Sequence, residues 1–227
     1  MSLRFFMQTE KKEKDLQEER NMKVILINGS PHGHGCTYTA LKEVEKTLRE
    51  EGIQTEMIYL GNKPIAGCRG CGYCKKNETC VQEDMVNEVR EKVLAADGLI
   101  LGSPVYFASA AGQATAFLDR LFCSAAGRFK YKLGASVVSC RRGGASAAFD
   151  QLNKYFTVCN MPVVSGTYWN QVHGNTPDEV KQDLEGMRNM RAIGRNMAWL
   201  LKSIEAGRNA GITEPEQEEA VKTNFIR

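Results

Sequence analysis

The stretch Lys23-Val-Ile-Leu-Ile-Asn28, followed by Gly29-Ser-Pro-His-Gly-His-Gly-Cys-Thr37, decides the fold of this 227-residue chain. Its first six residues form a short apolar run that ends in a glycine-rich turn, and this predicts a strand buried on both faces. Residues 37–51 then repeat apolar side chains at helical spacing, and Gly52 is a plausible stop. A buried strand that leads through a turn into an amphipathic helix predicts the first unit of an α/β sheet.

The same alternation continues along the chain and sets the fold class. Strands that alternate with helices form right-handed crossover units, so we expect a parallel sheet covered on both faces, a three-layer sandwich. Five such units favour the flavodoxin-like strand order 2-1-3-4-5, with ligands bound beyond the carboxyl ends of strands 1 and 3. The further strands are expected at 54–60, 98–102, 135–140 and 162–165, and the further helices at 84–96, 110–122, 145–158 and 177–206.

The chain is therefore expected to form one domain with extensions. The domain spans residues 22–206 and carries a cysteine-rich loop at 68–80. A charged extension, 1–21, precedes it, and a Glu-rich tail, 207–227, follows it. This length is enough to bury a sizeable core.

Composition excludes several classes of function. A net charge of +3 is too small to indicate a nucleic-acid partner. No apolar run approaches the roughly 18–20 residues of a membrane span, and no signal-like apolar segment follows Arg4, so we expect a cytoplasmic protein. In the cytoplasm, eight cysteines favour metal-bound, catalytic or buried thiols over disulfides. Cys123, Cys140 and Cys159 lie in apolar segments and are expected to be small core residues.

Four other cysteines form the sharpest local motif. Cys68, Cys71, Cys74 and Cys80 have the spacing C-x2-C-x2-C-x5-C, which is close to the bacterial ferredoxin run but ends in Val81 instead of proline. Because the run follows the second strand, we expect it at the ligand-binding edge of the sheet. Three interpretations stay open: a [4Fe–4S] cluster, zinc, and a loop without metal whose thiols are reduced or form disulfides.

The turn after the first strand has the features of a phosphate site. Backbone N–H groups and the positive helix end face an anion there, and Ser30, Thr37 and Thr39 add hydroxyl groups. The turn has no lysine for a Walker loop, and Tyr38 stands where a dinucleotide fingerprint starting at Gly33 needs glycine. A mononucleotide such as FMN suits this turn, and the alternative is a turn that only starts a helix.

Two more turns at the same edge favour a flat ligand. Residues 102–108 form an apolar loop whose aromatic side chains lie either against a ring or in the core. The turn at 139–144 has two glycines that allow close backbone approach. Arg141 or Arg142 of this turn could stabilise negative charge on a reduced ring or bind a phosphate of a second substrate. The alternative is a solvated arginine pair at the start of a helix.

With these pieces the chain resembles the NADPH-dependent FMN reductases of the flavodoxin-like superfamily, and within them the iron–sulfur flavoproteins. The resemblance spans about residues 22–205 and rests on NGSPHGHGCT (28–37), CRGCGYCKKNETC (68–80), GSPVYFASAAGQATAFLDRLF (102–122) and RRGG (141–144). It implies a tightly bound FMN, and dimers or tetramers with the flavin near a subunit interface, to which the loop 168–174 could contribute.

The resemblance also implies the site residues. The FMN phosphate would lie on Ser30, His32, Gly35, Cys36, Thr37 and Thr39. The isoalloxazine would lie on Pro104, Val105, Tyr106 and Phe107, with help from Arg141, Gly143 and Gly144. The family often has asparagine where Cys36 stands.

The function expected from this reading is an FMN-dependent NAD(P)H oxidoreductase that passes electrons to a small acceptor such as free flavin or a quinone. Hydride transfer on a flavin needs no protein acid or base, so no catalytic side chain is expected. The alternative is an electron carrier with FMN and a cluster that takes electrons from a protein donor such as a ferredoxin. A third reading is a flavodoxin-like scaffold that binds regulatory partners.

Overall fold

The computed structural model describes residues 21–125, 127–219, 221 and 223. Five parallel strands form its sheet in the order β2-β1-β3-β5-β6. Counted along the chain, these strands have the order 2-1-3-4-5, so the predicted fold class is confirmed. Their bounds are β1 (Lys23–Asn28), β2 (Gln54–Tyr59), β3 (Gly98–Tyr106), β5 (Leu133–Cys140) and β6 (Gln171–His173), and a two-residue β4 (Ser109–Ala110) pairs antiparallel with the end of β3.

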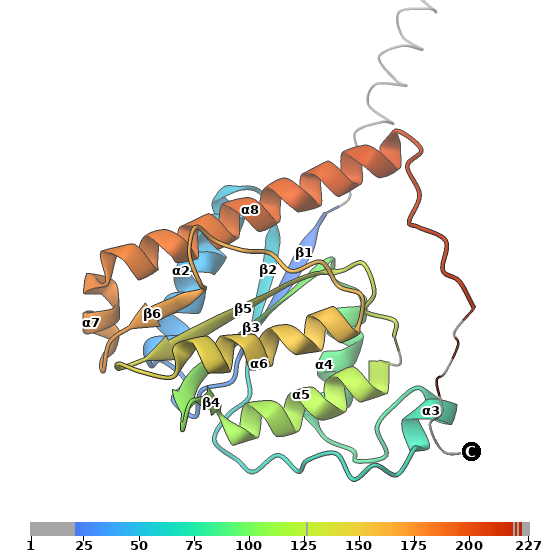
Figure 1. Cartoon of the computed structure of the whole chain (residues 1–227), viewed down its shortest axis with the longest axis horizontal. Coiled ribbons are helices and arrows are strands. Elements are labelled where there is room, and N and C mark those ends of the chain that lie inside the picture. Colours follow the sequence, from blue (N-terminus) through green and yellow to red (C-terminus); the bar gives the residue numbers. More distant parts are fainter. Residues whose placement is uncertain (1–20, 126, 220, 222, 224–227) are drawn as a thin grey trace, which may run out of the picture.

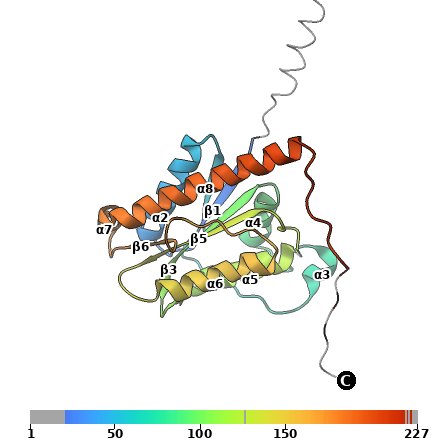
Figure 2. The same cartoon turned by 45° about the horizontal axis from the view of Figure 1, so that its top comes forward.

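Helices cover both faces of the sheet (Figures 1 and 2). Side chains of β1 alternate between two cores: Val24 and Leu26 face one, and Ile25 and Ile27 face the other. This double burial explains why β1 is apolar throughout. The first core is closed by α2 (Cys36–Glu50), α7 (Pro177–Gln182) and α8 (Leu184–Asn209), and the second by α4 (Met85–Leu94), α5 (Gly112–Ala125) and α6 (Ala145–Val158).

The helix predicted at 177–206 is in fact two helices, so that prediction is wrong at Asp183, near its start. Asp183 ends α7 and caps α8, since its carboxylate accepts a hydrogen bond from the Gly186 N–H at 2.9 Å. The same carboxylate accepts from the His173 N–H at 2.7 Å and thereby ties α8 to β6. The apolar stripe runs through the break and hides it from the sequence pattern.

The fifth strand also differs from its predicted position. Residues 162–165 make only a single bridge, between Gly134 and Val163. The chain then loops out, and the ladder resumes at β6. Asn189 holds the loop by accepting from the Thr167 N–H at 2.7 Å and donating to the Trp169 carbonyl at 2.9 Å.

Among the described residues, strand pairing in the sheet involves only residues between Lys23 and His173. Apart from Asn21, the predicted extension 1–21 lies outside the described residues. Helix α8 continues to Asn209, beyond its predicted end, and residues 212–219 have no regular secondary structure. Across the described ranges, we find no helix with the length and apolarity needed to span a membrane.

Candidate functional site

The three turns predicted as ligand loops meet at the carboxyl ends of the strands. The Gly29 N–H donates to the Gly102 carbonyl at 2.8 Å, which joins the turn after β1 to the middle of β3. The hydroxyls of Thr37 and Ser139 are 2.8 Å apart and join the start of α2 to the end of β5. These buried bonds fix the turns relative to one another.

Gly144 brings the third turn against the hairpin that follows β3. Its φ of +89° is left-handed, and a Cβ at this position would lie 2.8 Å from the Ala108 Cα. Only glycine therefore fits both the backbone conformation and the close approach. Gly144 also precedes α6, whose N-terminus has no side-chain cap.

The N-terminus of α2 is open for an anion. Gly35 is its N-cap, no side chain caps it, and its first turn contains no acidic residue. The first N–H groups of a helix have no intrahelical acceptor, and the helix dipole favours negative charge there. This fits the predicted phosphate site.

Asn28 shapes the turn that leads to this helix. Its fully buried side chain donates to the Gly33 carbonyl at 3.1 Å and accepts from the Ser30 N–H at 3.1 Å. The Ser30 hydroxyl accepts in turn from the His32 N–H at 3.1 Å. Sequence reasoning did not assign Asn28 a role, although a polar residue at the end of a buried strand was the available signal.

Several predicted phosphate ligands already have protein partners. The Thr37 hydroxyl is paired with Ser139, and the Thr39 hydroxyl donates to the Gly35 carbonyl at 3.1 Å. Cys36 contacts the Gly174 carbonyl at 3.7 Å, and burial raises the pKa of its thiol, which favours a neutral group beside an anion. Backbone amides are therefore the main donors that this turn offers.

The aromatic segment 102–108 is part of a hairpin that projects from the sheet. β3 continues to Tyr106, and Phe107 and Ala108 both have left-handed φ values, +51° and +59°, as a tight two-residue hairpin turn requires. Tyr106 is 44% exposed and Phe107 is fully exposed, so these rings do not enter the core. A bulky residue at positive φ is rare and costs about 1–3 kcal/mol, and such strain clusters at ligand sites.

The turn after β5 combines exposed charge with a buried thiol. Arg141, Arg142 and Gly143 are exposed at the start of α6. Cys140, a core residue as predicted, has its sulfur 3.4 Å from Nδ1 of His173 at the end of β6. Burial raises the pKa of the Cys140 thiol, so it remains protonated. Sequence reasoning gave His173 no role at this edge.

The cysteine loop does not stay at this edge, so its predicted position is wrong. It begins there, where the Gln113 side chain donates to the Gly61 carbonyl at 2.8 Å, and then runs along α5. From Gln113 to Cys123 a helix rises about 15 Å. Figure 1 shows β4 and the small helix α3 (Tyr73–Asn77) of the cysteine loop near opposite ends of α5.

The four cysteines of the motif face one cavity of about 270 Å³. Cys123, predicted as a core residue, is exposed and lines the same cavity, because it lies on the α5 face that meets the loop. Cys159 is half-buried.

Within the described ranges, no three cysteine, histidine or acidic side chains are arranged closely enough to hold a metal ion. The chemistry of an all-sulfur donor set of this kind suits an iron–sulfur or zinc centre. Other lining residues include Arg69, Lys75, Gln82, Arg120 and Ser124.

Arg120 anchors the loop to α5. Its side chain is fully buried and donates to the Asp84 carboxylate at 2.5 and 2.8 Å. It also donates to the carbonyls of Ala66 and Gln82, at 3.2 and 3.0 Å, and to the Cys80 sulfur at 3.3 Å. One guanidinium thus binds both sides of the cysteine motif. Burial raises the pKa of Asp84, but hydrogen bonds from Arg120 and from a backbone N–H outweigh it, so the net pKa is lowered.

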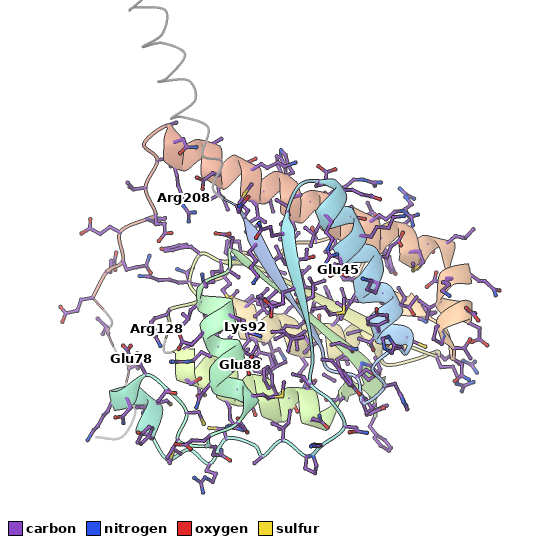
Figure 3. The ribbon with its side chains drawn as sticks, turned by 180° about the vertical axis from the view of Figure 1, so that it is seen from behind. Glu45, Glu78, Glu88, Lys92, Arg128 and Arg208 are labelled. Carbon is purple, nitrogen blue, oxygen red and sulfur yellow. The ribbon has the colours of Figure 1, made fainter. Side chains whose placement is uncertain are left out.

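A second arginine holds the loop at the surface. Arg128 pairs with the Glu78 carboxylate at 3.1 Å and donates to the Glu78 carbonyl at 3.1 Å. Figure 3 shows the two residues beside each other at the edge of the molecule. Both side chains are more than one-third exposed, so this pair contributes less to stability than Arg120 does.

Comparison with known proteins identifies the family. The NADPH-dependent FMN reductase family matches residues 22–176. An iron–sulfur flavoprotein of Methanocaldococcus jannaschii is 35% identical over 192 residues, covering 81% of this chain and 100% of the relative.

Solved structures support the fold alone. The NAD(P)H:quinone oxidoreductase from Methanothermobacter marburgensis has a TM-score of 0.62 at 17% identity, covering 78% of this chain and 100% of that one. A flavodoxin from the domain Archaea has a TM-score of 0.53 at 15% identity, covering 80% and 99%. The chain therefore belongs to the NADPH-dependent FMN reductase family, in its iron–sulfur flavoprotein group, and is a flavoprotein with the flavodoxin-like fold.

Proposed function

We propose that this protein is an FMN-dependent NAD(P)H oxidoreductase that passes electrons from a nicotinamide to a small acceptor such as free flavin or a quinone. The observation that carries the proposal is the uncapped N-terminus of α2 beside an exposed aromatic hairpin, at the carboxyl edge of the sheet. An anion site next to a flat apolar surface is what a phosphorylated flavin needs.

The turn after β1 would hold the phosphate, chiefly through the backbone amides of Cys36 and Thr37 at the start of α2. The hairpin from Pro104 to Phe107 would support the ring system. When bound, FMN supplies the chemistry of accepting two electrons from a nicotinamide and releasing them singly or in pairs. Because the protein needs no general acid or base for that chemistry, its contribution is binding, orientation and charge.

Arg141 and Arg142 supply positive charge at this edge. Both side chains are exposed beside the uncapped N-terminus of α6, so their charges add to the positive end of the helix dipole there. They would stabilise negative charge on a reduced ring or on the phosphates of the nicotinamide. The exposed surface of Tyr106 leaves room for the nicotinamide and the acceptor to bind in turn.

Turnover with defined substrates tests the proposal. The purified chain is mixed with FMN, with NADPH or NADH, and with a quinone or free flavin as acceptor, and nucleotide oxidation is followed. We expect turnover that depends on FMN and needs no protein partner. If neither nucleotide supports turnover with any of these acceptors, the reductase proposal fails.

The cysteine cavity favours a second candidate, an electron carrier with FMN and an iron–sulfur centre. Its sulfur donors and the names of the relatives support such a centre, with Cys68, Cys71, Cys74 and Cys80 as the ligands of a [4Fe–4S] cluster. The donor would be a protein such as a ferredoxin. Reduction by a reduced ferredoxin but not by nicotinamide would favour this candidate. Iron and acid-labile sulfide analysis would separate a cluster from zinc or a metal-free loop.

We also propose a homodimer or homotetramer. Phe107 is fully exposed, and Tyr168 and Trp169 of the predicted interface loop are each about half exposed, at 55% and 51%. Exposed aromatic residues are enriched at protein interfaces. Sedimentation of the FMN-loaded chain checks this, and a monomer at micromolar concentration would contradict it.

A further inference from the structure

Five cysteines, one more than the motif contains, line the cavity beside α5. The additional one, Cys123, belongs to the helix and not to the loop. Cys68 and Cys74 lie within electrostatic range of its sulfur and face the same cavity. Cys123 is therefore a neighbour of the motif's first and third sulfurs.

The five sulfurs differ in how firmly they are held. Cys68 and Cys71 are exposed in a segment without helix or strand, and Cys74 lies in a five-residue helix with no buried residue. Cys123 is exposed too, but its helix is packed on the core through Phe117 and Leu121. Its sulfur therefore keeps a defined position while the loop rearranges.

Arg120 strengthens this wall of the cavity. It lies three residues before Cys123, so the two side chains share a face of α5. Arg120 donates to the Cys80 sulfur at 3.3 Å, while Cys123 and Cys68 face the same cavity. The helix thus presents two neighbouring side chains, Arg120 and Cys123, to the cavity that the motif's cysteines line.

We propose that Cys123 is a reserve ligand of the sulfur site, able to replace Cys68 on a soft metal centre. The inference rests on the proposed metal centre in this cavity. In the exchange, the Cys123 thiol releases its proton and bonds the metal, while the Cys68–metal bond breaks and that sulfur takes up a proton. No electron is gained or lost. The exchange would keep a metal bound while the exposed Cys68 is not engaged.

Cobalt binding to the full-length chain tests the exchange. Co²⁺ is the probe because thiolate ligands give it a characteristic charge-transfer absorption, and it favours the same soft donors as iron or zinc. Metal-free protein is titrated anaerobically, and retained FMN reports that each variant is folded. The variants are Cys68→Ser, Cys123→Ser and the double substitution, with Cys68→Ser/Cys159→Ser as the matched control, since Cys159 does not line the cavity.

We expect Cys123→Ser to bind Co²⁺ like the wild type. Cys68→Ser should keep the thiolate absorption, with affinity within about tenfold of wild type, because Cys123 takes the vacant position. Cys68→Ser/Cys123→Ser should bind at least about 100-fold more weakly than Cys68→Ser, whereas the control with Cys159→Ser should not.

Two results overturn the inference, and they can be told apart. If Cys68→Ser and Cys68→Ser/Cys123→Ser bind cobalt equally, or if Cys68→Ser alone abolishes binding, Cys123 is no reserve ligand, although the metal centre stands. If the wild type gives no cobalt–thiolate absorption and holds no iron, the metal centre itself fails, and the inference fails with it. The FMN reductase proposal is unaffected in both cases.

Discussion

Replacing Arg120 with methionine tests whether this one side chain anchors the cysteine loop. Methionine keeps most of the apolar stem and removes every hydrogen bond of the guanidinium. Those bonds join α5 to the Asp84 carboxylate, to the carbonyls of Ala66 and Gln82 and to the Cys80 sulfur. The substitution should loosen the loop and lower the free energy of unfolding.

The structure bounds the size of the loss. Removing one partner of a fully buried ion pair costs about 3–5 kcal/mol. The Arg120 side chain is 0% exposed, but the Asp84 side chain is 35% exposed, so water can replace the guanidinium around the carboxylate. We therefore expect a loss of about 2–3 kcal/mol. For a domain of this size that corresponds to a fall in Tm of about 4–12 °C.

Thermal unfolding followed by circular dichroism measures the loss, and trypsin cleavage after Lys75 and Lys76 reports the loop itself. Arg128→Met is the matched control, because Arg128 holds the same loop through an exposed pair worth about 0–1 kcal/mol. We expect faster cleavage and a lower Tm for Arg120→Met than for Arg128→Met. Equal Tm values and equal cleavage rates for the two variants would refute the anchoring role.

Three further predictions concern the same two sites. Gly144→Ala should weaken FMN binding and lower stability, because the new Cβ would lie 2.8 Å from the hairpin and the backbone has a φ of +89°. Gly143→Ala is the control, since a Cβ at that position has no atom within 4 Å, and it should bind FMN normally in a fluorescence titration. Replacing Phe107 and Ala108 with Asn-Gly should raise the free energy of unfolding in urea by about 1 kcal/mol, since these residues suit a left-handed turn, and should weaken FMN binding; lower stability would contradict this. Folding lowers the pKa of Asp84 below its ordinary value of 3.8, so the stability that its pair with Arg120 contributes is present above pH 3.8 and is lost as the pH falls through the folded pKa. The difference in unfolding free energy between wild type and Asp84→Asn should therefore shrink when urea titrations are repeated at acid pH. A difference that stays constant with pH would count against the pair.

Local patterns predicted the features that depend on neighbouring residues. The apolar run of β1 and its glycine-rich turn predicted both the first strand and the open end of α2. The order of the parallel strands followed from the alternation of elements, which general rules of chain topology restrict. The turns at 102–108 and 139–144 were predicted to meet at one edge, and they do.

The features that failed depend on contacts between distant segments. Asp183 breaks the last helix because its carboxylate binds both Gly186 and the distant His173 N–H, while the apolar stripe continues across the break. The cysteine loop follows α5 because Arg120 binds it at several points, and no spacing within 68–80 encodes that path. The apolar neighbours of Cys123 predict a core residue, but Cys123 lies on the face of α5 along which the cysteine loop runs.

We propose that the converging turns hold an FMN that a nicotinamide reduces directly. The most direct measurement is an anaerobic titration of the FMN-loaded chain with NADPH and NADH, followed by visible absorption. We predict that equimolar FMN stays bound through gel filtration and that at least one nucleotide bleaches the flavin bands without any protein partner. A chain that retains no FMN, or whose bound FMN neither nucleotide reduces, would contradict the claim.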